Sequence, residues 1–471
     1  MTMNTLKVDV AIIGAGTAGM TAWRSAVKEG ARAVLIEDGP YGTTCARVGC
    51  MPSKLLIAAA EAAHAAEHAS AFGVNVEGVR IDGRAVMQRV RSERDRFVGY
   101  TLRGIESMPE ADKLRGRARF LSENVLDVGG HTQVEARAIV IATGTRPNIP
   151  EAYQPLGDRA IVNDDVFDWT DLPESVLVVG AGVIGLELGQ ALSRLGVRTR
   201  ILQRSAHVGG LRDPLVYRSA VAAFREELDL CLEAAILDVR RVGDAAEVRY
   251  QVAGEPQVVE QFDYVLLAAG RTPNLDDIGL ENTSARLGPK GVPLYDAQTL
   301  QLKDAPIFIA GDVNGVLPLL HEAADDGRIA GRNAARYPDV TPAERRAPLS
   351  IVFSDPQLAA VGLRFNELPD DAAVGEVDFA NQGRSRIMLK NRGKLRVYAQ
   401  RGSGVFLGAE MAGPAMEHIA HLLAWCVQQK LTVDQMLAMP FYHPVVEEGL
   451  RTALQHLAAE LSVASTPAAQ T

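Results

Sequence analysis

Short apolar runs alternate with longer amphipathic segments in the first part of the chain. VDVAII (8–13) predicts a buried strand, GAGTAG (14–19) a tight turn before a helix, and AVLIE (33–37) a second strand. The same order recurs at 176–203, where VLVV precedes the glycine-rich GAGVIG (180–185). Strands that alternate with helices favour a parallel, doubly wound sheet. Two copies therefore predict an α/β fold with two Rossmann-like nucleotide-binding domains.

The segments around the second copy carry weaker patterns. KLLIAAAEAAHAAEHA (54–69) is rich in alanine and predicts a helix. Two similar runs, at 139–150 and 264–274, read as strands that end in Pro/Gly turns, and FIAGDVNG (308–315) reads as another strand and turn. We interpret the first two as the exits of the two nucleotide-binding domains.

From about residue 349 the pattern becomes β-rich, and two helices follow at about 416–429 and 445–462. This indicates a C-terminal α+β domain. The small, polar tail ASTPAAQT (464–471) is expected to be disordered. The expected domains are 1–150 with 272–348, then 151–271, then 349–471.

Composition narrows the class of protein. A length of 471 residues suggests roughly three domains. A net charge of −9 argues against a nucleic-acid partner. The N-terminus lacks the features of a secretory signal, and no apolar run reaches the length of a membrane span of about 18 residues. We therefore expect a cytoplasmic protein without a membrane partner.

The first glycine-rich turn fits the dinucleotide pattern G-x-G-x-x-G. Gly14 permits the tight turn, Gly16 lets a pyrophosphate approach the backbone, and Gly19 lets helix and strand pack closely. Glu37, at the end of the next strand, is placed to accept hydrogen bonds from a ribose. The alternative is a tight turn of an α/β fold that binds no ligand.

The second turn repeats the glycines as Gly180, Gly182 and Gly185. Where an acid would accept the ribose 2′-OH, the chain has Gln203 followed by Arg204. Arginine at this place pairs with a 2′-phosphate, which predicts a preference for NADP over NAD. The alternative is a solvated surface arginine. Two further basic residues of the same loop are available to such a phosphate, His207 and Arg212.

Two of the four cysteines, Cys45 and Cys50, lie close together in CARVGC. Their spacing lets the thiols meet where the segment turns or starts a helix. Lys54 lies one helical turn further on, and positive charge at a helix N-terminus favours thiolate. No second cysteine pair is available to complete a zinc site, so we expect no metal. The alternative is a pair of inert, packed cysteines.

His443 and Glu448 lie five residues apart in FYHPVVEEGL. A carboxylate that orients an imidazole makes a general base suited to a thiol. Taken by itself, such a pair is more often structural or solvated.

Eight motifs follow one another along the chain: GAGTAG, CARVGCMPSK, ATGTRP, GAGVIGLELG, AAGRTPN, AGDVNG, HEAADDG and YHPVVEE. In this set and order the chain resembles the flavoprotein pyridine nucleotide–disulfide oxidoreductases, over roughly residues 6–460. The dihydrolipoamide dehydrogenase branch is the most similar, with glutathione, trypanothione and mycothione reductases as relatives.

The resemblance implies FAD and NAD(P)H as cofactors. The first turn with Glu37 would hold the ADP half of FAD, and the second turn with Gln203 and Arg204 would hold the nicotinamide nucleotide. Asp312 would lie near the ribityl chain, and His321 would open the segment at the pyrimidine edge of the flavin. The remaining expected cofactor residues are Thr143, Gly144, Gly270 and Gly311.

The resemblance also implies an electron path. Cys50 would face the flavin, and Cys45 would exchange with a small disulfide or dithiol substrate. Lys54, paired with Glu187, would place positive charge near flavin N5. His443, oriented by Glu448, would serve as acid and base, and it would come from the partner subunit of a homodimer. The candidate catalytic residues are Cys45, Cys50, Lys54, Glu187, His443 and Glu448.

The chain departs from the lipoamide branch near the cysteines and the histidine. The usual Gly-Gly-Thr-Cys reads Gly42-Thr43-Thr44-Cys45, the pair after Cys45 is Ala46-Arg47, and the histidine run reads FYHPV (441–445). These departures leave open the identity of the substrate, and Gln203 with Arg204 leaves open the nucleotide preference. Thiol–disulfide exchange is near-balanced, so the sequence does not fix the direction of the reaction.

Other functions on the same scaffold fit less well. A soluble transhydrogenase would lack one of the paired cysteines, and a mercuric reductase would carry a C-terminal pair that is missing here. An NADPH-dependent reductase of another small disulfide stays open as an alternative. So does a flavoprotein that acts mainly as a docked component, for which a 2-oxo acid dehydrogenase complex is the candidate partner.

Overall fold

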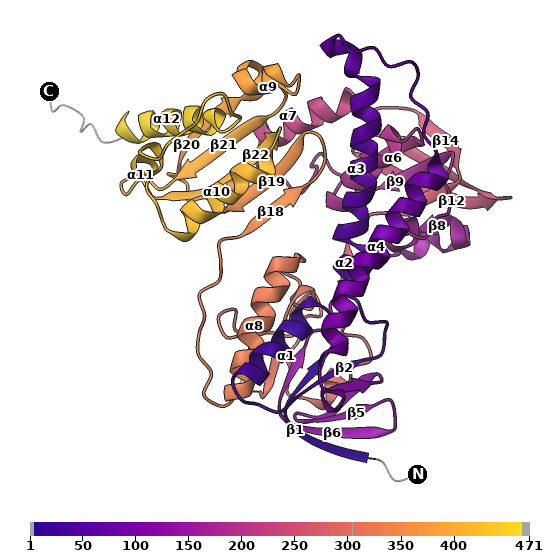
Figure 1. Ribbon diagram of the computed structural model, residues 1–471, viewed down its shortest axis with the longest axis vertical. Coiled ribbons are helices and arrows are strands. Elements are labelled where there is room, and N and C mark those ends of the chain that lie inside the picture. The colour runs from indigo at the N-terminus through magenta and orange to yellow at the C-terminus, as the bar shows by residue number, and fades with distance from the viewer. Residues whose placement is uncertain (1–3, 304, 464–471) are drawn as a thin grey trace. The chain divides into compact units, whose positions relative to one another are not determined.

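A computed structural model describes residues 4–303 and 305–463, so the expected disorder of 464–471 lies outside the described residues. The chain forms two compact units, each built from separate stretches of sequence (Figure 1). The first unit comprises 1–55, 88–148 and 270–345, and the second comprises 56–87, 149–269 and the chain from 346 onward. The division into three domains with the boundaries given above stays a prediction.

A seven-stranded sheet forms the centre of the first unit. Its strands run in the order β3 (Lys113–Arg115), β2 (Ala33–Glu37), β1 (Asn4–Ile13), β6 (Thr132–Ile141), β5 (Val125–Val128) and β4 (Ala118–Ser122), with β17 (Ile307–Ile309) beside β6. The central pairs are parallel. Successive side chains of β1 enter opposite cores, Ile12 on one face and Ile13 on the other. Burial of both faces explains why this strand reads as a continuous apolar run.

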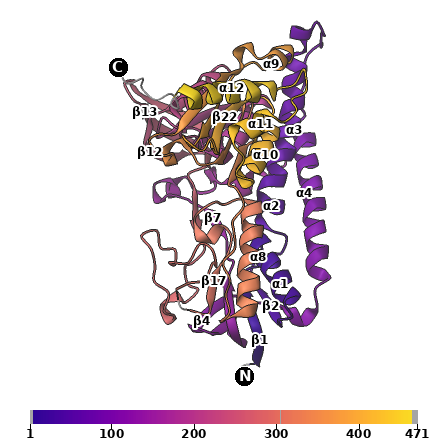
Figure 2. The ribbon, with the colours of Figure 1, turned by 90° about the vertical axis from the view of Figure 1, so that its left-hand side faces the viewer.

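Helices α1 (Thr17–Lys28) and α8 (Leu320–Arg336) lie side by side in the first unit (Figures 1 and 2). Glycines make this approach possible. A Cβ at Gly327 would lie 2.2 Å from the carbonyl oxygen of Ala18, and one at Gly331 would lie 2.2 Å from that of Ala22. The start of α8 is thereby held close to the glycine-rich turn that precedes α1.

The second unit contains a parallel five-stranded sheet. Its order is β11 (Asp229–Leu232), β10 (Arg198–Gln203), β9 (Ser175–Val179), β15 (Tyr264–Leu267) and β8 (Ala160–Ile161), with helices α6 (Val183–Arg194) and α7 (Pro214–Arg225) between strands. An antiparallel sheet, β12 (Ala234–Val242), β13 (Ala245–Val252) and β14 (Gln257–Phe262), packs onto it through a shared apolar core. The sequence pattern did not predict this smaller sheet.

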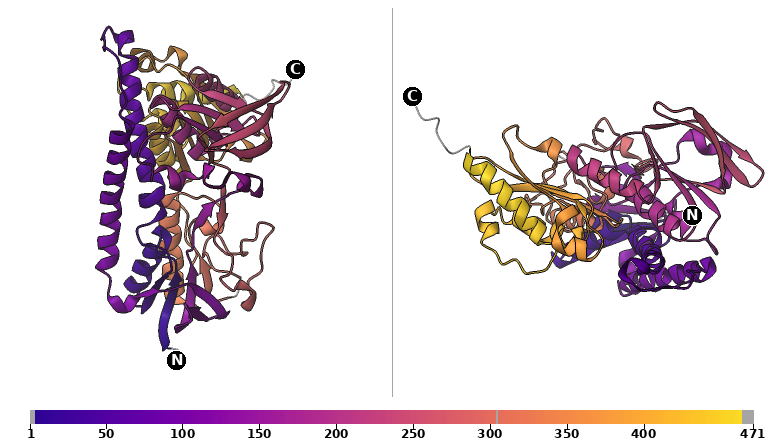
Figure 3. Two further views of the ribbon diagram at one scale, coloured as in Figure 1. Left: turned by 90° about the vertical axis from the view of Figure 1, so that its right-hand side faces the viewer. Right: turned by 90° about the horizontal axis from the view of Figure 1, so that it is seen from above.

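An antiparallel five-stranded sheet follows in the same unit, in the order β18 (Leu349–Val352), β19 (Gln357–Gly362), β22 (Phe406–Gly413), β21 (Lys394–Ala399) and β20 (Ala373–Asp378). Helices α10 (Met416–Gln428) and α12 (Glu448–Val463) pack on it (Figure 3), and α11 (Val433–Leu437) precedes α12. The expected fold class, two Rossmann-like halves and an α+β domain, is confirmed. The sequence analysis missed β20 and α11, and it started α12 three residues early.

Several helices and strands complete the described chain: α2 (Thr44–Val48), α3 (Cys50–Glu67), α4 (Gly83–Glu106), α5 (Asn163–Val166), α9 (Gly383–Ile387), β7 (Thr145–Pro147) and β16 (Arg271–Pro273). The sequence analysis did not predict the long helix α4. Across the described residues, every helix is too short or too polar to traverse a lipid bilayer.

Candidate active site

The first glycine-rich turn is built so tightly that side chains are excluded from it. Gly14 has φ of 106°, and a Cβ there would lie 2.4 Å from the carbonyl oxygen of Ala142. A Cβ at Gly19 would lie 1.8 Å from the carbonyl oxygen of Gly14. At Gly16 a Cβ would meet nothing within 4 Å, so the backbone there is open to a ligand.

Helix α1 begins at this opening. Gly16 is its N-cap, and no side chain caps the first turn, so its N–H groups are available to an anion. The Glu37 carboxylate accepts hydrogen bonds from Ala15 N–H at 2.7 Å and from Gly39 N–H at 2.8 Å. These contacts fix the acid beside the turn, and a carboxylate has further lone pairs for ribose hydroxyls.

Thr143 and Gly144 follow β6 at the same edge of the sheet. The side chain of Asn274 donates to Thr143 O at 3.0 Å, and its backbone N–H donates to Gly144 O at 3.0 Å. The Thr143 hydroxyl is buried and finds no hydrogen-bond partner among the described residues. A buried polar group without a partner is costly, and a bound ligand would supply the partner.

Asp312 is a second buried acceptor in this region. Burial raises the pKa of its carboxyl, and the charge of Arg271 partly offsets that effect. Its Oδ2 accepts a long hydrogen bond of 3.5 Å from the Thr145 hydroxyl. Gly311, with φ of 81°, is held by Asp326 of α8, whose Oδ2 accepts the Gly311 N–H at 3.1 Å. Ligand hydroxyls that donate hydrogen bonds to Asp312 would stabilise its buried carboxylate.

These features fit a flavin nucleotide: an uncapped helix end, an acid fixed beside the turn, a buried hydroxyl without a partner among the described residues and a buried carboxylate, all in one unit. Two of the other expected residues are less informative. His321 lies on the first turn of α8 and is half-exposed, and Gly270, with φ of 97°, has open space at its Cβ position.

The second glycine-rich turn repeats the geometry of the first. Gly180 has φ of 107°, and a Cβ there would lie 2.5 Å from Ala268 O. A Cβ at Gly185 would lie 1.8 Å from Gly180 O, whereas Gly182 has open space and begins α6 without a side-chain cap. The start of α6 can therefore bind the pyrophosphate of another dinucleotide, as the start of α1 can in the first unit.

Gln203 occupies the place of the acid at the second turn. Its Oε1 accepts the N–H of Ala181 at 3.1 Å, as Glu37 does from Ala15. Its Nε2 donates to His207 O at 3.0 Å and thereby holds the loop that follows β10. Arg204 is exposed at the start of this loop. Because Gln203 is neutral, a 2′-phosphate at this place would not meet the repulsion of an acidic side chain, and it would lie next to the exposed guanidinium of Arg204.

The cysteine pair lies where α2 ends and α3 begins. Cys45 is on α2 and Cys50 is the first residue of α3. The two cysteines are not joined by a disulfide, and their side chains form a hydrogen bond. That hydrogen bond, followed by burial and the charge of Cys50, raises the pKa of Cys45 well above its usual value, while the charge of Lys54 opposes the rise. The predicted meeting of the two thiols is present in the structure.

Thr43 holds an unusual backbone conformation just before the pair. Its φ is 58° and its ψ is 145°, a region that β-branched residues rarely adopt. The Thr43 hydroxyl accepts the N–H of Ala46 at 3.3 Å and caps α2. The lipoamide-type sequence has glycine here, and glycine adopts positive φ freely. The departure noted in the sequence therefore carries backbone strain next to the thiols.

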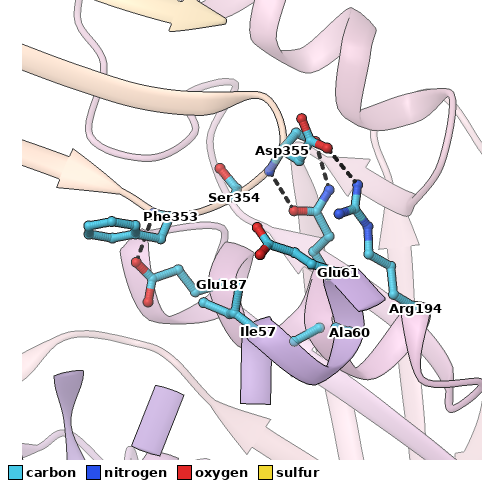
Figure 4. A pocket seen from close by; sticks show the side chains of 10 residues that line it. Ile57, Ala60, Glu61, Glu187, Arg194, Phe353, Ser354 and Asp355 are labelled. Carbon is cyan, nitrogen blue, oxygen red and sulfur yellow. Dashed lines mark hydrogen bonds and ion pairs between the residues drawn. The ribbon is translucent and has the colours of Figure 1, made fainter. Parts of the chain in front are cut away.

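Glu187 lies on α6 and is 4% exposed. Its Oε1 accepts the backbone N–H of Phe353 at 3.0 Å, and Figure 4 shows its carboxylate directed to the segment of residues 353–355. The segment is fastened to α6 again at Gln190, which exchanges two hydrogen bonds of 2.7 and 2.8 Å with the backbone of Asp355. Arg194 adds an ion pair with the Asp355 carboxylate at 3.3 Å. The expected pairing of Glu187 with Lys54 stays a prediction.

His443 and Glu448 are in contact. The distance from His443 Nδ1 to Glu448 Oε1 is 2.9 Å, and this hydrogen bond lowers the pKa of Glu448. Glu448 begins α12, whereas His443 lies in the preceding loop rather than on the helix. The His443 side chain is 80% exposed. The contact with Glu448 thus engages Nδ1, on a side chain that is mostly exposed.

Side chains that bind metals do not gather in groups of three or more within residues 4–303 and 305–463. Two dinucleotide turns and a hydrogen-bonded thiol pair define instead a class of enzyme: an FAD-dependent oxidoreductase that couples a pyridine nucleotide to a disulfide.

Comparison with known families agrees. Residues 8–327 match the model of the pyridine nucleotide-disulphide oxidoreductases, and residues 349–454 match the dimerisation domain of the same family. The chain therefore belongs to the pyridine nucleotide-disulphide oxidoreductase family.

Its relatives include dihydrolipoyl dehydrogenases. The protein of that name from Bacillus subtilis (strain 168) is 29% identical over 459 residues, which cover 95% of this chain and 98% of the relative. Two solved structures share the fold. The Cu(II) complex of the HOCl-induced flavoprotein disulfide reductase RclA from Escherichia coli has a TM-score of 0.81, is 23% identical, and the match covers 95% of this chain and 99% of RclA. LpdA from Mycobacterium tuberculosis has a TM-score of 0.80 and is 23% identical, over 96% and 99% of the two chains.

Sequence reasoning missed residues that support the site. Asn274, Arg271 and Asp326 lie inside motifs that it quoted, and their polar side chains within such short motifs were the available signal. Glu410, described below, stands in an apolar strand without any motif.

Proposed function

We propose that the chain is a dihydrolipoyl dehydrogenase-like enzyme that moves electrons between NAD(P)H and a small, lipoamide-like disulfide or dithiol. The observation that carries the proposal is the hydrogen-bonded pair of Cys45 and Cys50 at the start of α3, within the electrostatic reach of Lys54. A dithiol in this position can cycle between reduced and disulfide forms.

FAD would be held by the first turn, Glu37, Thr143 and Asp312, and when bound it supplies the two-electron link between nicotinamide and the cysteine disulfide. Lys54 would place positive charge beside it, with Glu187 as the partner of Lys54. These roles are assigned from the family resemblance together with the fit described above.

The thiol steps follow from the chain's own residues. The Cys45 thiolate attacks one sulfur of the substrate disulfide, and the departing thiolate takes a proton from His443. Cys50 then attacks the Cys45 sulfur, which releases the second substrate thiol and re-forms the Cys45–Cys50 disulfide. The hydrogen bond to Cys50 and burial raise the pKa of Cys45, so a base near this thiol would favour its attack.

His443 would act across a homodimer, on the cysteine pair of the partner subunit. Its exposure supports this role, and so does the exposure of four large apolar side chains in the region of the family's dimerisation domain: Leu422, Trp425, Met439 and Tyr442. A 2-oxo acid dehydrogenase complex is the candidate larger assembly, on the ground of the dihydrolipoyl dehydrogenase relatives.

One alternative has support of its own. Gln203 and Arg204 favour NADPH, which fits an NADPH-dependent reductase of another small disulfide. Steady-state assays of the purified holoenzyme with lipoamide and with glutathione disulfide, each with NADH and NADPH, distinguish the two. Turnover of lipoamide supports the proposal, turnover of glutathione disulfide alone supports the alternative, and reduction of neither contradicts the lipoamide proposal and the glutathione form of the alternative.

A further inference from the structure

The loop that follows Gln203 is held from outside the nucleotide-binding sheet. The loop, residues 204–213, lies between β10 and α7. On one side its Gly209 N–H donates to Ala181 O at 2.8 Å, directly at the second glycine-rich turn. Its later part also contacts β22 of the antiparallel sheet and the segment between β19 and β20.

Glu410 of β22 makes the central contact. Its Oε2 accepts the N–H groups of Arg212 at 2.6 Å and Asp213 at 3.1 Å, and its Oε1 accepts Phe365 N–H at 2.9 Å. The side chain is fully buried. Burial of a carboxylate is costly unless several donors satisfy it, so these three N–H groups and the carboxylate fix one another.

Neighbouring contacts hold the same stretch. Asp213 caps α7 through Leu215 N–H at 2.9 Å, and its other oxygen binds Arg396 at 2.6 Å and the Tyr398 hydroxyl at 2.8 Å. Arg364 donates to Gly210 O at 3.0 Å. The end of the loop is therefore anchored to the antiparallel sheet, while the side chains of Arg204 and Arg212 stay exposed.

We propose that Glu410 is a positioning residue for the nicotinamide nucleotide. By fixing the backbone of Arg212 and Asp213, it holds loop 204–213 against the second glycine-rich turn, with the loop's arginines set for the ribose phosphate. The inference rests on the proposed function, because it assumes that this turn binds NAD(P). It adds a residue from the dimerisation sheet, remote in sequence, to the determinants of nucleotide affinity.

The test compares two carboxylate-to-amide variants of the holoenzyme. In Glu410→Gln, an amide replaces the acceptor of three N–H groups. The matched control is Asp263→Asn, since Asp263 also accepts two consecutive N–H groups, those of Glu174 and Ser175, at the opposite end of β9. Calorimetric titration with NADP⁺ and NAD⁺ gives the dissociation constants. The rate at which dithiothreitol reduces the flavin anaerobically measures the transfer of electrons from a dithiol, which does not involve the nucleotide.

We expect Glu410→Gln to raise the dissociation constant of the preferred nucleotide by about tenfold. Asp263→Asn and the wild type should bind equally, and dithiothreitol should reduce the flavin of all three at one rate. Unchanged affinity in Glu410→Gln overturns the inference alone. A wild type that binds neither nucleotide overturns the proposed function as well.

If Glu410→Gln does not fold, Arg364→Met tests the same claim from the Gly210 side of the loop, with the same expected loss of affinity. A folded Arg364→Met variant with wild-type nucleotide affinity would overturn the inference.

Discussion

The Nδ1 atom of His443 lies 2.9 Å from Oε1 of Glu448, at the point where α12 begins. The contact fixes the imidazole and leaves its Nε2 on an exposed side chain. A base that is held at one nitrogen and open at the other suits proton exchange with a thiol.

Replacing this base should separate the two halves of the reaction. His443→Gln is expected to slow flavin reduction by a dithiol about a hundredfold or more, because the attacking thiol must then ionise without help. Reduction by NAD(P)H should not change. Stopped-flow absorbance measures both rates, with His456→Gln as the control, since His456 binds the backbone oxygen of Glu376. Equal dithiol rates in wild type and His443→Gln would remove the residue from the mechanism.

The exchange role proposed for Cys45 predicts a signature of its own. Cys45→Ser should abolish disulfide turnover and leave FAD bound, because the residues expected to hold the flavin nucleotide do not include Cys45. Flavin absorbance of the purified variant and a turnover assay are sufficient. Cys231→Ser, at a separate cysteine on β11, should behave as wild type. Recovery of Cys45→Ser as apoprotein would contradict the assigned role.

The raised pKa of Cys45 predicts a pH effect. The hydrogen bond to Cys50 and the charge of Cys50 raise the pKa of Cys45. In the reduced wild type, Cys45 should therefore ionise at a higher pH than it would without these two effects. Cys50→Ser weakens both effects, lowers the pKa and increases the thiolate fraction. Alkylation of Cys45 by iodoacetamide, located by peptide mass spectrometry, should therefore begin at lower pH in Cys50→Ser than in the reduced wild type. Superimposable pH profiles would show that the two thiols are not coupled.

The fold class and the geometry of the two glycine-rich turns were predictable because they depend on local patterns. Apolar runs before GAGTAG and GAGVIG located both central strands, and the close approach of backbone to backbone at Gly19 and Gly185 requires glycine. The spacing of the two cysteines was sufficient to predict that their thiols meet.

Other features depend on contacts between distant parts of the chain. Glu410 meets Arg212 across 198 positions, and a single acid in an apolar strand gives no sign of its partners. The backbone of Thr43 was not predictable for a different reason. The sequence showed a residue that is unusual at this position, but only the structure shows its positive φ.

The strain at Thr43 can be measured. Thr43→Gly should raise the free energy of unfolding by about 1 kcal/mol, because glycine adopts this φ without the penalty of a β-carbon. Loss of the hydroxyl cap offsets only a few tenths of a kcal/mol. Chemical denaturation of the holoenzyme gives the difference, with Thr44→Gly as the control, since Thr44 already lies in α2, where glycine is unfavourable. A less stable Thr43→Gly would show that the cap outweighs the strain.

We propose that the nucleotide preference depends on Arg204. Arg204→Glu should shift the ratio of kcat/KM from NADPH toward NADH, because a carboxylate repels the 2′-phosphate and accepts a hydrogen bond from a free 2′-OH. The control variant is Arg225→Glu, which makes the same change of charge at another exposed arginine, on α7. A fixed ratio in Arg204→Glu would identify Arg204 as a surface charge only.

The most direct test of the central claim is an anaerobic titration of the holoenzyme with NADH and NADPH, observed by absorbance. Transfer of electrons from nucleotide to the Cys45–Cys50 disulfide should produce a long-wavelength band from a thiolate next to oxidised flavin, and the band should be lost in Cys50→Ser. Complete bleaching of the flavin without that band would contradict the account, because the cysteine pair would then receive no electrons from the nucleotide.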